Sequence, residues 1–151
     1  MRRLGKIEDK LQQLGLSLPE VPVPIGNYKP TNREANLLYT SGQGSRSIRG
    51  QVGAELSIEQ GYEAAQEAAL GCLAAIKAEL GSLDRVKKIL KVLGFINSAP
   101  GFGEQPAVLN GCSDLLVKGP IYLTHTNICF ILDSEGDESS HEKNIQATAQ
   151  S

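Results

Sequence analysis

The sequence predicts a single α/β or α+β domain, and three segments carry that prediction. A long helix is expected from Ser57 to Leu80, a strand from Val86 to Asn97, and a second helix from Pro106 to Lys118. The chain has 151 residues, which is the usual length of one domain and is enough to bury a hydrophobic core.

The long helix has a recognisable start and end. Ser57 and Gln60 have the spacing of a capping box, and Gly81 follows Leu80 where a left-handed C-cap favours glycine. Between these ends apolar residues recur at three- and four-residue spacing, as on one face of a helix. Many of them are alanine, which allows close packing on a sheet. The stripe consists of Ile58, Tyr62, Ala65, Ala69, Cys72, Leu73, Ile76 and Leu80.

The segments before this helix are shorter. A small amphipathic helix is expected from Ile7 to Leu14, where Gly15 ends it. The stretch from Ser17 to Pro30 holds four of the seven prolines and is predicted to be an extended arm. A strand from Ala35 to Gln43 follows, with apolar residues on both faces, and residues 44–53 are expected to form a loop.

The strand from Val86 to Asn97 is also apolar on both faces, and one helix can cover only one of them. A partner subunit is the simplest cover for the other face. Residues 121–132 are expected to supply one more strand. Residues 133–151 contain almost no large apolar residue, so a disordered tail is predicted there. The expected layout is therefore an N-terminal helix in residues 1–16, a main domain in residues 17–132, and the tail.

Composition excludes several functions. The net charge is −2, so no nucleic-acid partner is expected, and no apolar run is long enough to span a membrane. The three cysteines are odd in number and lack metal-ligand spacing, which favours reduced thiols in the cytoplasm and no metal site. Cys112 is interpreted as a core residue rather than a nucleophile. Lys87, Lys88 and Lys91 are interpreted as a solvated strand edge rather than an RNA surface.

Several short segments, taken in order, resemble the reactive-intermediate deaminase family (Rid, YjgF-like), also labelled liver perchloric-acid-soluble endoribonuclease. The segments are PIGNY at 24–28, NLLYTSGQ at 36–43, GYEAA at 61–65 and LDRV at 83–86. Two more, GFINSAPGF at 94–102 and VLNG at 108–111, are similar to the branch labelled YjgF/chorismate-mutase-like putative endoribonuclease. The resemblance covers about residues 7–117.

The resemblance implies an α+β, chorismate-mutase-like fold, in which a mixed sheet carries two helices on one face. It also implies a homotrimer that binds small molecules in clefts between subunits, with no cofactor. The family's last two strands have no clear counterpart after Leu116, so the C-terminal strands are expected to be incomplete or replaced.

The resemblance further implies hydrolysis of enamine and imine intermediates, such as 2-iminobutanoate and 2-iminopropanoate, with release of ammonia. Tyr28 and Asn110 match catalytic positions of the cleft, where Tyr28 would orient water or substrate and Asn110 would donate to a carboxylate or carbonyl. The substrate-binding positions match Ser41, Gly42 and Gln43.

One feature of the active family members is missing. They bind the substrate carboxylate through an arginine that follows the second helix, and this chain has no arginine after Leu116. Lys118, Arg46 and Arg49 are the cations that could replace it. The sequence therefore predicts at best a weak deaminase. A non-catalytic, small-molecule-binding trimer is the first alternative, and an endoribonuclease, which would need a basic surface, is the second.

Overall fold

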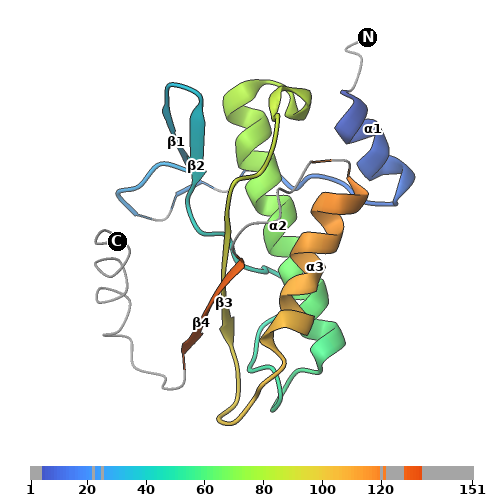
Figure 1. The fold of residues 1–151 in the computed structure, drawn as a ribbon, viewed down its shortest axis with the longest axis vertical. Coiled ribbons are helices and arrows are strands. Elements are labelled where there is room, and N and C mark those ends of the chain that lie inside the picture. The colour runs from blue at the N-terminus through green and yellow to red at the C-terminus, as the bar shows by residue number, and fades with distance from the viewer. Residues whose placement is uncertain (1–4, 22, 25, 120, 122–127, 134–151) are drawn as a thin grey trace.

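The computed structural model describes residues 5–21, 23–24, 26–119, 121 and 128–133. Within them the protein is α+β, with three helices and two small sheets (Figure 1). The predicted tail, from residue 134 onwards, lies outside the described residues, as do residues 122–127 of the predicted last strand. In chain order the elements are α1 (Lys6–Gln13), β1 (Thr31–Glu34), β2 (Leu37–Thr40), α2 (Ile58–Leu80), the 3-10 turn η1 (Leu83–Arg85), β3 (Val92–Asn97), α3 (Gln105–Lys118) and β4 (Ile128–Asp133).

The capping box of α2 is present as the sequence predicts. The Gln60 N–H donates to Ser57 Oγ over 3.2 Å, and the Gln60 side chain accepts from the Ser57 N–H over 2.9 Å. At the other end Gly81 has φ = 81°, in the left-handed region, and its N–H donates to the Lys77 carbonyl. These two caps fix the length of the helix on which the rest of the fold packs.

Helices α2 and α3 lie side by side and make the largest contact in the fold (Figure 1). Gly111 makes the close approach possible, because a Cβ there would lie 2.0 Å from the Tyr62 carbonyl oxygen. The Tyr62 hydroxyl donates to Asp114 over 2.9 Å across the same interface. The second helix starts at Gln105, one residue before the predicted start. Its inward side chains include Val108, Leu115 and Leu116.

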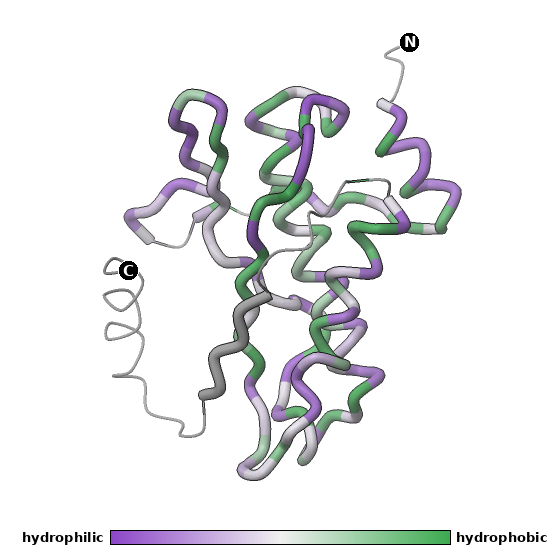
Figure 2. The backbone as a smooth tube through the Cα atoms, in the orientation of Figure 1, coloured by the Kyte–Doolittle hydropathy of each residue, from purple (hydrophilic) through white to green (hydrophobic). Residues whose placement is uncertain are grey.

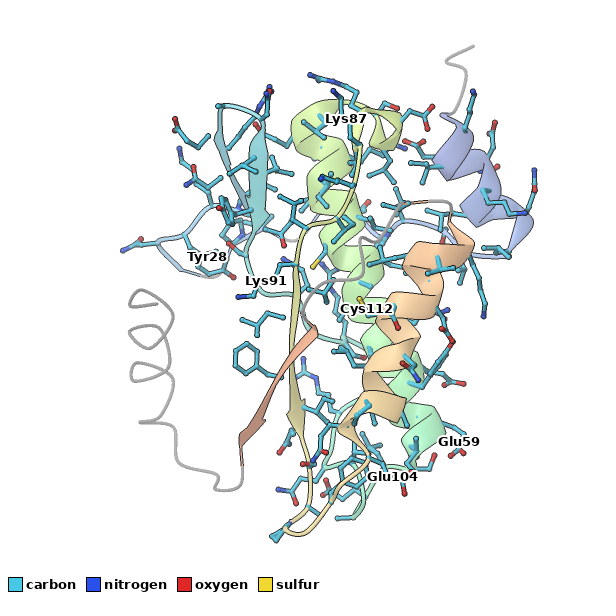
Figure 3. The ribbon with its side chains drawn as sticks, in the orientation of Figure 1. Tyr28, Glu59, Lys87, Lys91, Glu104 and Cys112 are labelled. Carbon is cyan, nitrogen blue, oxygen red and sulfur yellow. The ribbon has the colours of Figure 1, made fainter. Side chains whose placement is uncertain are left out.

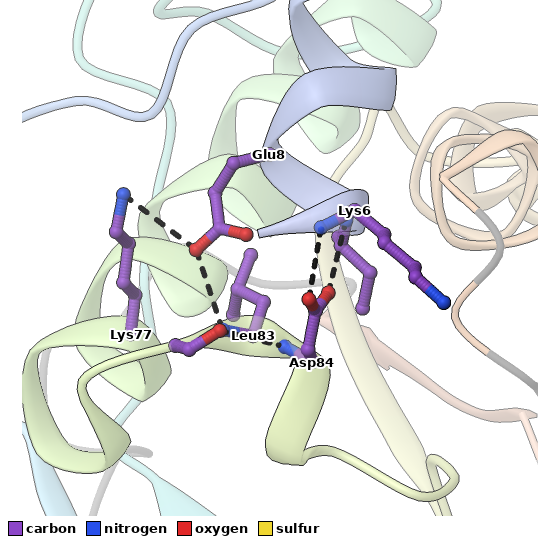
Figure 4. Close-up of polar contacts among 7 residues, drawn as sticks. Lys6, Glu8, Lys77, Leu83 and Asp84 are labelled. Atoms are coloured by element: carbon purple, nitrogen blue, oxygen red, sulfur yellow. Dashed lines mark hydrogen bonds and ion pairs between the residues drawn. The ribbon is translucent and has the colours of Figure 1, made fainter. Parts of the chain in front are cut away.

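Helix α1 belongs to the same hydrophobic core as α2 and α3. Ile7 and Leu11 are buried in one cluster with Leu73, Leu83 and Leu115. The start of α1 is capped from a distance (Figure 4), because Asp84 accepts from the N–H groups of Lys6 over 2.8 Å and Ile7 over 3.1 Å. The N-terminal helix is therefore tied to η1 by polar contacts as well as by apolar packing.

Glu8 is a buried acid in this contact and is only 5% exposed. Its Oε1 atom accepts from the Leu83 N–H over 3.3 Å and lies 3.6 Å from Lys77 Nζ (Figure 4). Its Oε2 atom has no hydrogen-bond partner within the described residues. The ion pair with Lys77 compensates part of the cost of burying the carboxylate.

The strands form two separate pairs rather than one continuous mixed sheet. β1 and β2 are antiparallel, with Thr31 opposite Thr40, whereas β3 and β4 are parallel, with Val92 opposite Ile128. β1 is an element that the sequence analysis missed, because its residues Thr31–Glu34 are all polar and show no apolar pattern. The predicted strand at Ala35–Gln43 is confined to Leu37–Thr40, since Ala35 occupies the turn with φ = 49°.

β3 starts at Val92, six residues later than predicted. Lys87, Lys88 and Lys91 are exposed in the segment between η1 and β3, and Figure 3 labels Lys87 and Lys91. β3 itself is a run of hydrophobic residues (Figure 2), and Ile96 is buried against α3 and its neighbours.

The opposite face of the strands is uncovered within the described part of the chain. Phe95 is 59% exposed and Leu93 is 43% exposed, and on β2 Tyr39 is 62% exposed. The expectation that both faces of these strands are apolar is therefore met, and the described residues cover only one of them. No helix in the described residues is both long and apolar enough to cross a membrane.

Candidate functional site

A cavity of about 230 Å³ lies between the proline-rich arm and the loop that follows β2. Three of the five predicted site residues, Tyr28, Gly42 and Gln43, line it together. Tyr28 is labelled in Figure 3, where it projects from the arm beside the β1–β2 hairpin. The complete lining within the described residues is Val23, Pro24, Tyr28, Pro30, Gly42, Gln43, Gly44, Ser45 and Arg46.

Ser41 fastens the arm to the end of β2. Its Oγ donates to the Lys29 carbonyl, and its N–H donates to the Pro30 carbonyl over 2.9 Å. Pro30 fixes its own φ angle, so the chain that leads from Tyr28 into β1 is stiff. Ser41 does not line the cavity, and its contribution is to hold Tyr28 beside the residues that follow β2.

Gln43 rests against α2 at Gly71. A Cβ on Gly71 would lie 3.4 Å from the Cβ and Oε1 atoms of Gln43, so the helix surface is flat where this side chain crosses it. Gly71 costs about 1 kcal/mol relative to alanine inside a helix. At 3.4 Å a Cβ on Gly71 would make only ordinary contact with Gln43, so this packing tolerates alanine and does not by itself require the glycine.

Glu67 of α2 anchors the loop on the far side of the cavity. Its carboxylate accepts from the hydroxyls of Ser45 and Ser47, both over 2.6 Å, and from the N–H groups of Arg46 over 2.9 Å and Ser47 over 3.2 Å. Burial opposes ionisation, but these hydrogen bonds outweigh it and lower the pKa of Glu67 to about 2. Nothing in the helical pattern of α2 links Glu67 to a loop about 20 residues earlier in the chain, so sequence reasoning does not find this residue.

Arg46 supplies the positive charge in the lining of this cavity. Among the described residues that line it, Arg46 is the one charged side chain. Its guanidinium donates to the Glu20 carbonyl over a long 3.4 Å, and no carboxylate of the described residues lies within 4 Å of it. Arg49, in the same loop, is exposed and does not line the cavity.

Asn110, the remaining predicted site residue, is on the exposed side of α3. Its carbonyl accepts from Ser113 Oγ over 3.4 Å, and its side chain is not among the residues that line the cavity. A single chain therefore brings Tyr28, Gly42 and Gln43 together, with Ser41 behind them, and leaves Asn110 apart.

Cys72 and Cys112 have protonated thiols at neutral pH. Burial raises the pKa of Cys112 to about 11, with a smaller contribution from the nearby Cys72, and burial also raises the pKa of Cys72. Cys112 is marked in Figure 3 on the side of α3 that faces the core. These thiols are packing residues rather than nucleophiles. Within the described residues, no group of three or more metal-binding side chains lies close enough together to hold an ion.

A family model and individual known proteins both match this chain. Residues 8–124 match the family model described as "YjgF/chorismate mutase-like, putative endoribonuclease". The chain is 39% identical over 119 residues to "Protein TCP17" of Trypanosoma cruzi, covering 76% of this chain and 74% of that protein.

Two crystal structures have a similar fold. One is described as a "putative endoribonuclease" from Shewanella oneidensis MR-1, with a TM-score of 0.74, 32% identity, and coverage of 85% of this chain and 87% of that chain. The other is the protein Atu1372 from Agrobacterium tumefaciens, described as having unknown function, with a TM-score of 0.71 and 32% identity. The match covers 83% of this chain and 82% of that chain.

Proposed function

Because this chain belongs to the YjgF/chorismate mutase-like family, we propose that it binds a small amino-acid-derived metabolite and is at best a weak enamine or imine deaminase. The observation that carries the proposal is the cavity, in which Tyr28 from the arm meets Gly42 and Gln43 from the end of β2. Those segments are separate in sequence, and Ser41 holds them together.

The size of the cavity favours a small ligand. At about 230 Å³ it is below the roughly 300–1,000 Å³ that is typical of pockets for drug-sized molecules. A 2-imino or 2-oxo acid with a short side chain is of a suitable size. A nucleotide or an RNA chain is much larger than this cavity.

The proposed chemistry is the addition of water to a C=N bond. Water attacks the imine carbon, a proton moves to the nitrogen, and the C–N bond then breaks to release ammonia and a 2-oxo acid. Tyr28 is placed to orient the water or the substrate. The described lining contains no aspartate, glutamate, histidine, lysine or cysteine, so few groups there can move a proton, which supports slow turnover.

Self-association is part of the proposal. We place the contact between subunits on the exposed apolar face of the strands, which includes Phe95, Leu93 and Tyr39, because a surface of this kind marks an interaction site. A homotrimer would join the strand pairs into the family's larger, mixed-sheet architecture. Asn110 of one subunit would then complete the cleft of the next. Cys72 and Cys112 are free thiols, which supports a cytoplasmic location.

An endoribonuclease activity has weaker support. The exposed residues Lys87, Lys88 and Lys91 form the one basic cluster that the sequence analysis singled out, while the whole chain carries a net charge of −2. Nucleic-acid binding depends mainly on the neutralisation of phosphates by basic side chains.

The proposal is tested by binding and turnover in the same preparation. Binding of 2-oxobutanoate would be followed by NMR chemical-shift changes, and ammonia release would be measured from 2-iminobutanoate generated by a pyridoxal-phosphate enzyme. We expect shifts at Gly42, Gln43 and Gly44, and slow ammonia release that Tyr28→Phe reduces further. Tyr39→Phe is the matched control, since Tyr39 does not line the cavity. No shifts in the cavity, or cleavage of RNA with no response to 2-oxo acids, would refute the proposal.

A further inference from the structure

We propose that Arg46 is the anion-binding group of the cavity and that its ligand is a small carboxylate with a short, uncharged body. The inference rests on the proposed function and adds the chemical class of the ligand and the residue that recognises it. In a family whose active members use an arginine that this chain lacks, it assigns the role to a loop residue from a different part of the fold.

The charge of Arg46 is available to a ligand. Within the described residues its guanidinium has no carboxylate within 4 Å, and its hydrogen bond to the Glu20 carbonyl is 3.4 Å long. A guanidinium has five N–H donors in a planar fork, which matches the two oxygens of a carboxylate. Since the other described lining residues are uncharged, the lining offers an anion one positive charge. The Glu67 carboxylate lies behind the lining, where Ser45, Arg46 and Ser47 donate hydrogen bonds to it.

The loop that carries Arg46 is fixed before any ligand arrives. Glu67 accepts four hydrogen bonds from Ser45, Arg46 and Ser47, and all four donors are neutral hydroxyl or backbone N–H groups. The Ile48 N–H also donates to Ser45 Oγ over 2.9 Å, which closes the turn. Glu67 thus holds the backbone of Arg46 without forming an ion pair with its guanidinium, and is a positioning residue. A loop that is ordered in advance loses less entropy when it binds.

The arm residues of the cavity define the rest of the ligand. They are Val23, Pro24 and Pro30, with the ring of Tyr28, so this part of the lining is largely apolar. A carboxylate at Arg46 would therefore direct a short apolar substituent towards the arm. A 2-oxo or 2-imino acid with a small aliphatic side chain has this distribution of charge, whereas inorganic phosphate has no apolar part.

Four variants and three probes test the assignment. The probes are sodium 2-oxobutanoate, its uncharged methyl ester and inorganic phosphate, each titrated by NMR into the full-length chain. The variants are Arg46→Gln, Arg46→Lys, Glu67→Gln and, as the matched control, Arg49→Gln, which removes the same charge from the same loop outside the cavity. Each variant would first be compared with the wild type by circular dichroism.

For the carboxylate we expect Arg46→Gln to weaken binding about tenfold, since a charge-assisted hydrogen bond is lost. Arg46→Lys should retain part of the affinity, and Arg49→Gln all of it. The ester should bind weakly and equally to every one of these proteins. Glu67→Gln should weaken carboxylate binding and speed hydrogen exchange at the Arg46 and Ser47 N–H groups, while amides in α3 remain protected.

The outcomes separate the two proposals. If the wild type binds 2-oxobutanoate in the cavity but Arg46→Gln and Arg49→Gln have the same affinity, the assignment of Arg46 is overturned and the proposed function stands. Equal affinity for the acid and its ester, or tighter binding of phosphate, overturns the carboxylate class. If none of the probes shifts the cavity resonances of the wild type, the proposed function and this inference both fall.

Discussion

Replacing Gly111 with alanine should force α2 and α3 apart. The new Cβ would lie 2.0 Å from the Tyr62 carbonyl oxygen, 2.8 Å from the Tyr62 carbonyl carbon and 3.2 Å from the Gln66 backbone nitrogen. Ordinary contact begins at 3.4 Å, so the helices would have to open by about 1.4 Å at this point. Backbone atoms cannot rotate out of the way as a flexible side chain can.

Two opposing terms set the size of the effect. Forcing an extra carbon into a packed interface costs about 1–3 kcal/mol, and the upper value applies here because the obstacle is main chain. Alanine gains about 1 kcal/mol over glycine inside a helix. The net loss of stability is therefore about 2 kcal/mol, or about 4–8 °C in melting temperature for a domain of this size.

Urea denaturation followed by circular dichroism measures this loss, with every protein at the same concentration. Gly71→Ala is the matched control: it is the same substitution inside α2, but its Cβ would meet only the Gln43 side chain, at 3.4 Å. It should leave stability unchanged or raise it by up to about 1 kcal/mol. A Gly111→Ala protein as stable as the wild type would show that the helices do not pack this closely.

Three other predictions concern α1, the loop anchor and the apolar face. Asp84→Ala should cost about 1 kcal/mol by removing the cap of α1, and unchanged hydrogen exchange in α1 would contradict it. Glu67 has a pKa of about 2 when folded, below the ordinary 4.5, so its stabilisation is full above pH 4.5 and is lost as the pH falls towards 2. In Glu67→Gln the free energy of unfolding should change less between pH 4.5 and pH 2 than it does in the wild type. If both proteins lose stability in parallel over that range, the hydrogen bonds to Glu67 do not have the stabilising role described. Phe95→Lys should dissociate the proposed oligomer in sedimentation velocity, whereas Val117→Lys, on α3 and similarly exposed, should not. A monomeric wild type would exclude the proposed interface.

The sequence determined the elements whose signals are local. A capping box at Ser57 and a glycine at 81 set the ends of α2, because those hydrogen bonds join residues within one helical turn. The apolar strand at Val92–Asn97 and the helix ended by Gly15 follow from periodicity and from backbone conformation in the same way. Strand β1 escaped detection because four polar residues become a strand only through pairing with β2.

Only part of the candidate site could be predicted from the sequence. The family resemblance pointed to Tyr28, Gly42 and Gln43, which the fold brings to one cavity. Their neighbours Glu67 and Arg46 take their places through hydrogen bonds between a helix and a loop about 20 residues earlier in the chain, and no pattern within either segment records such a bond. Asp84 caps α1 although it is 77 or 78 residues away in sequence. Gly111 is needed for the packing of α3 because the Tyr62 carbonyl of α2 lies where a Cβ would be. The sequence by itself thus fixed what depends on neighbours along the chain, and the tertiary structure decided what depends on neighbours in space.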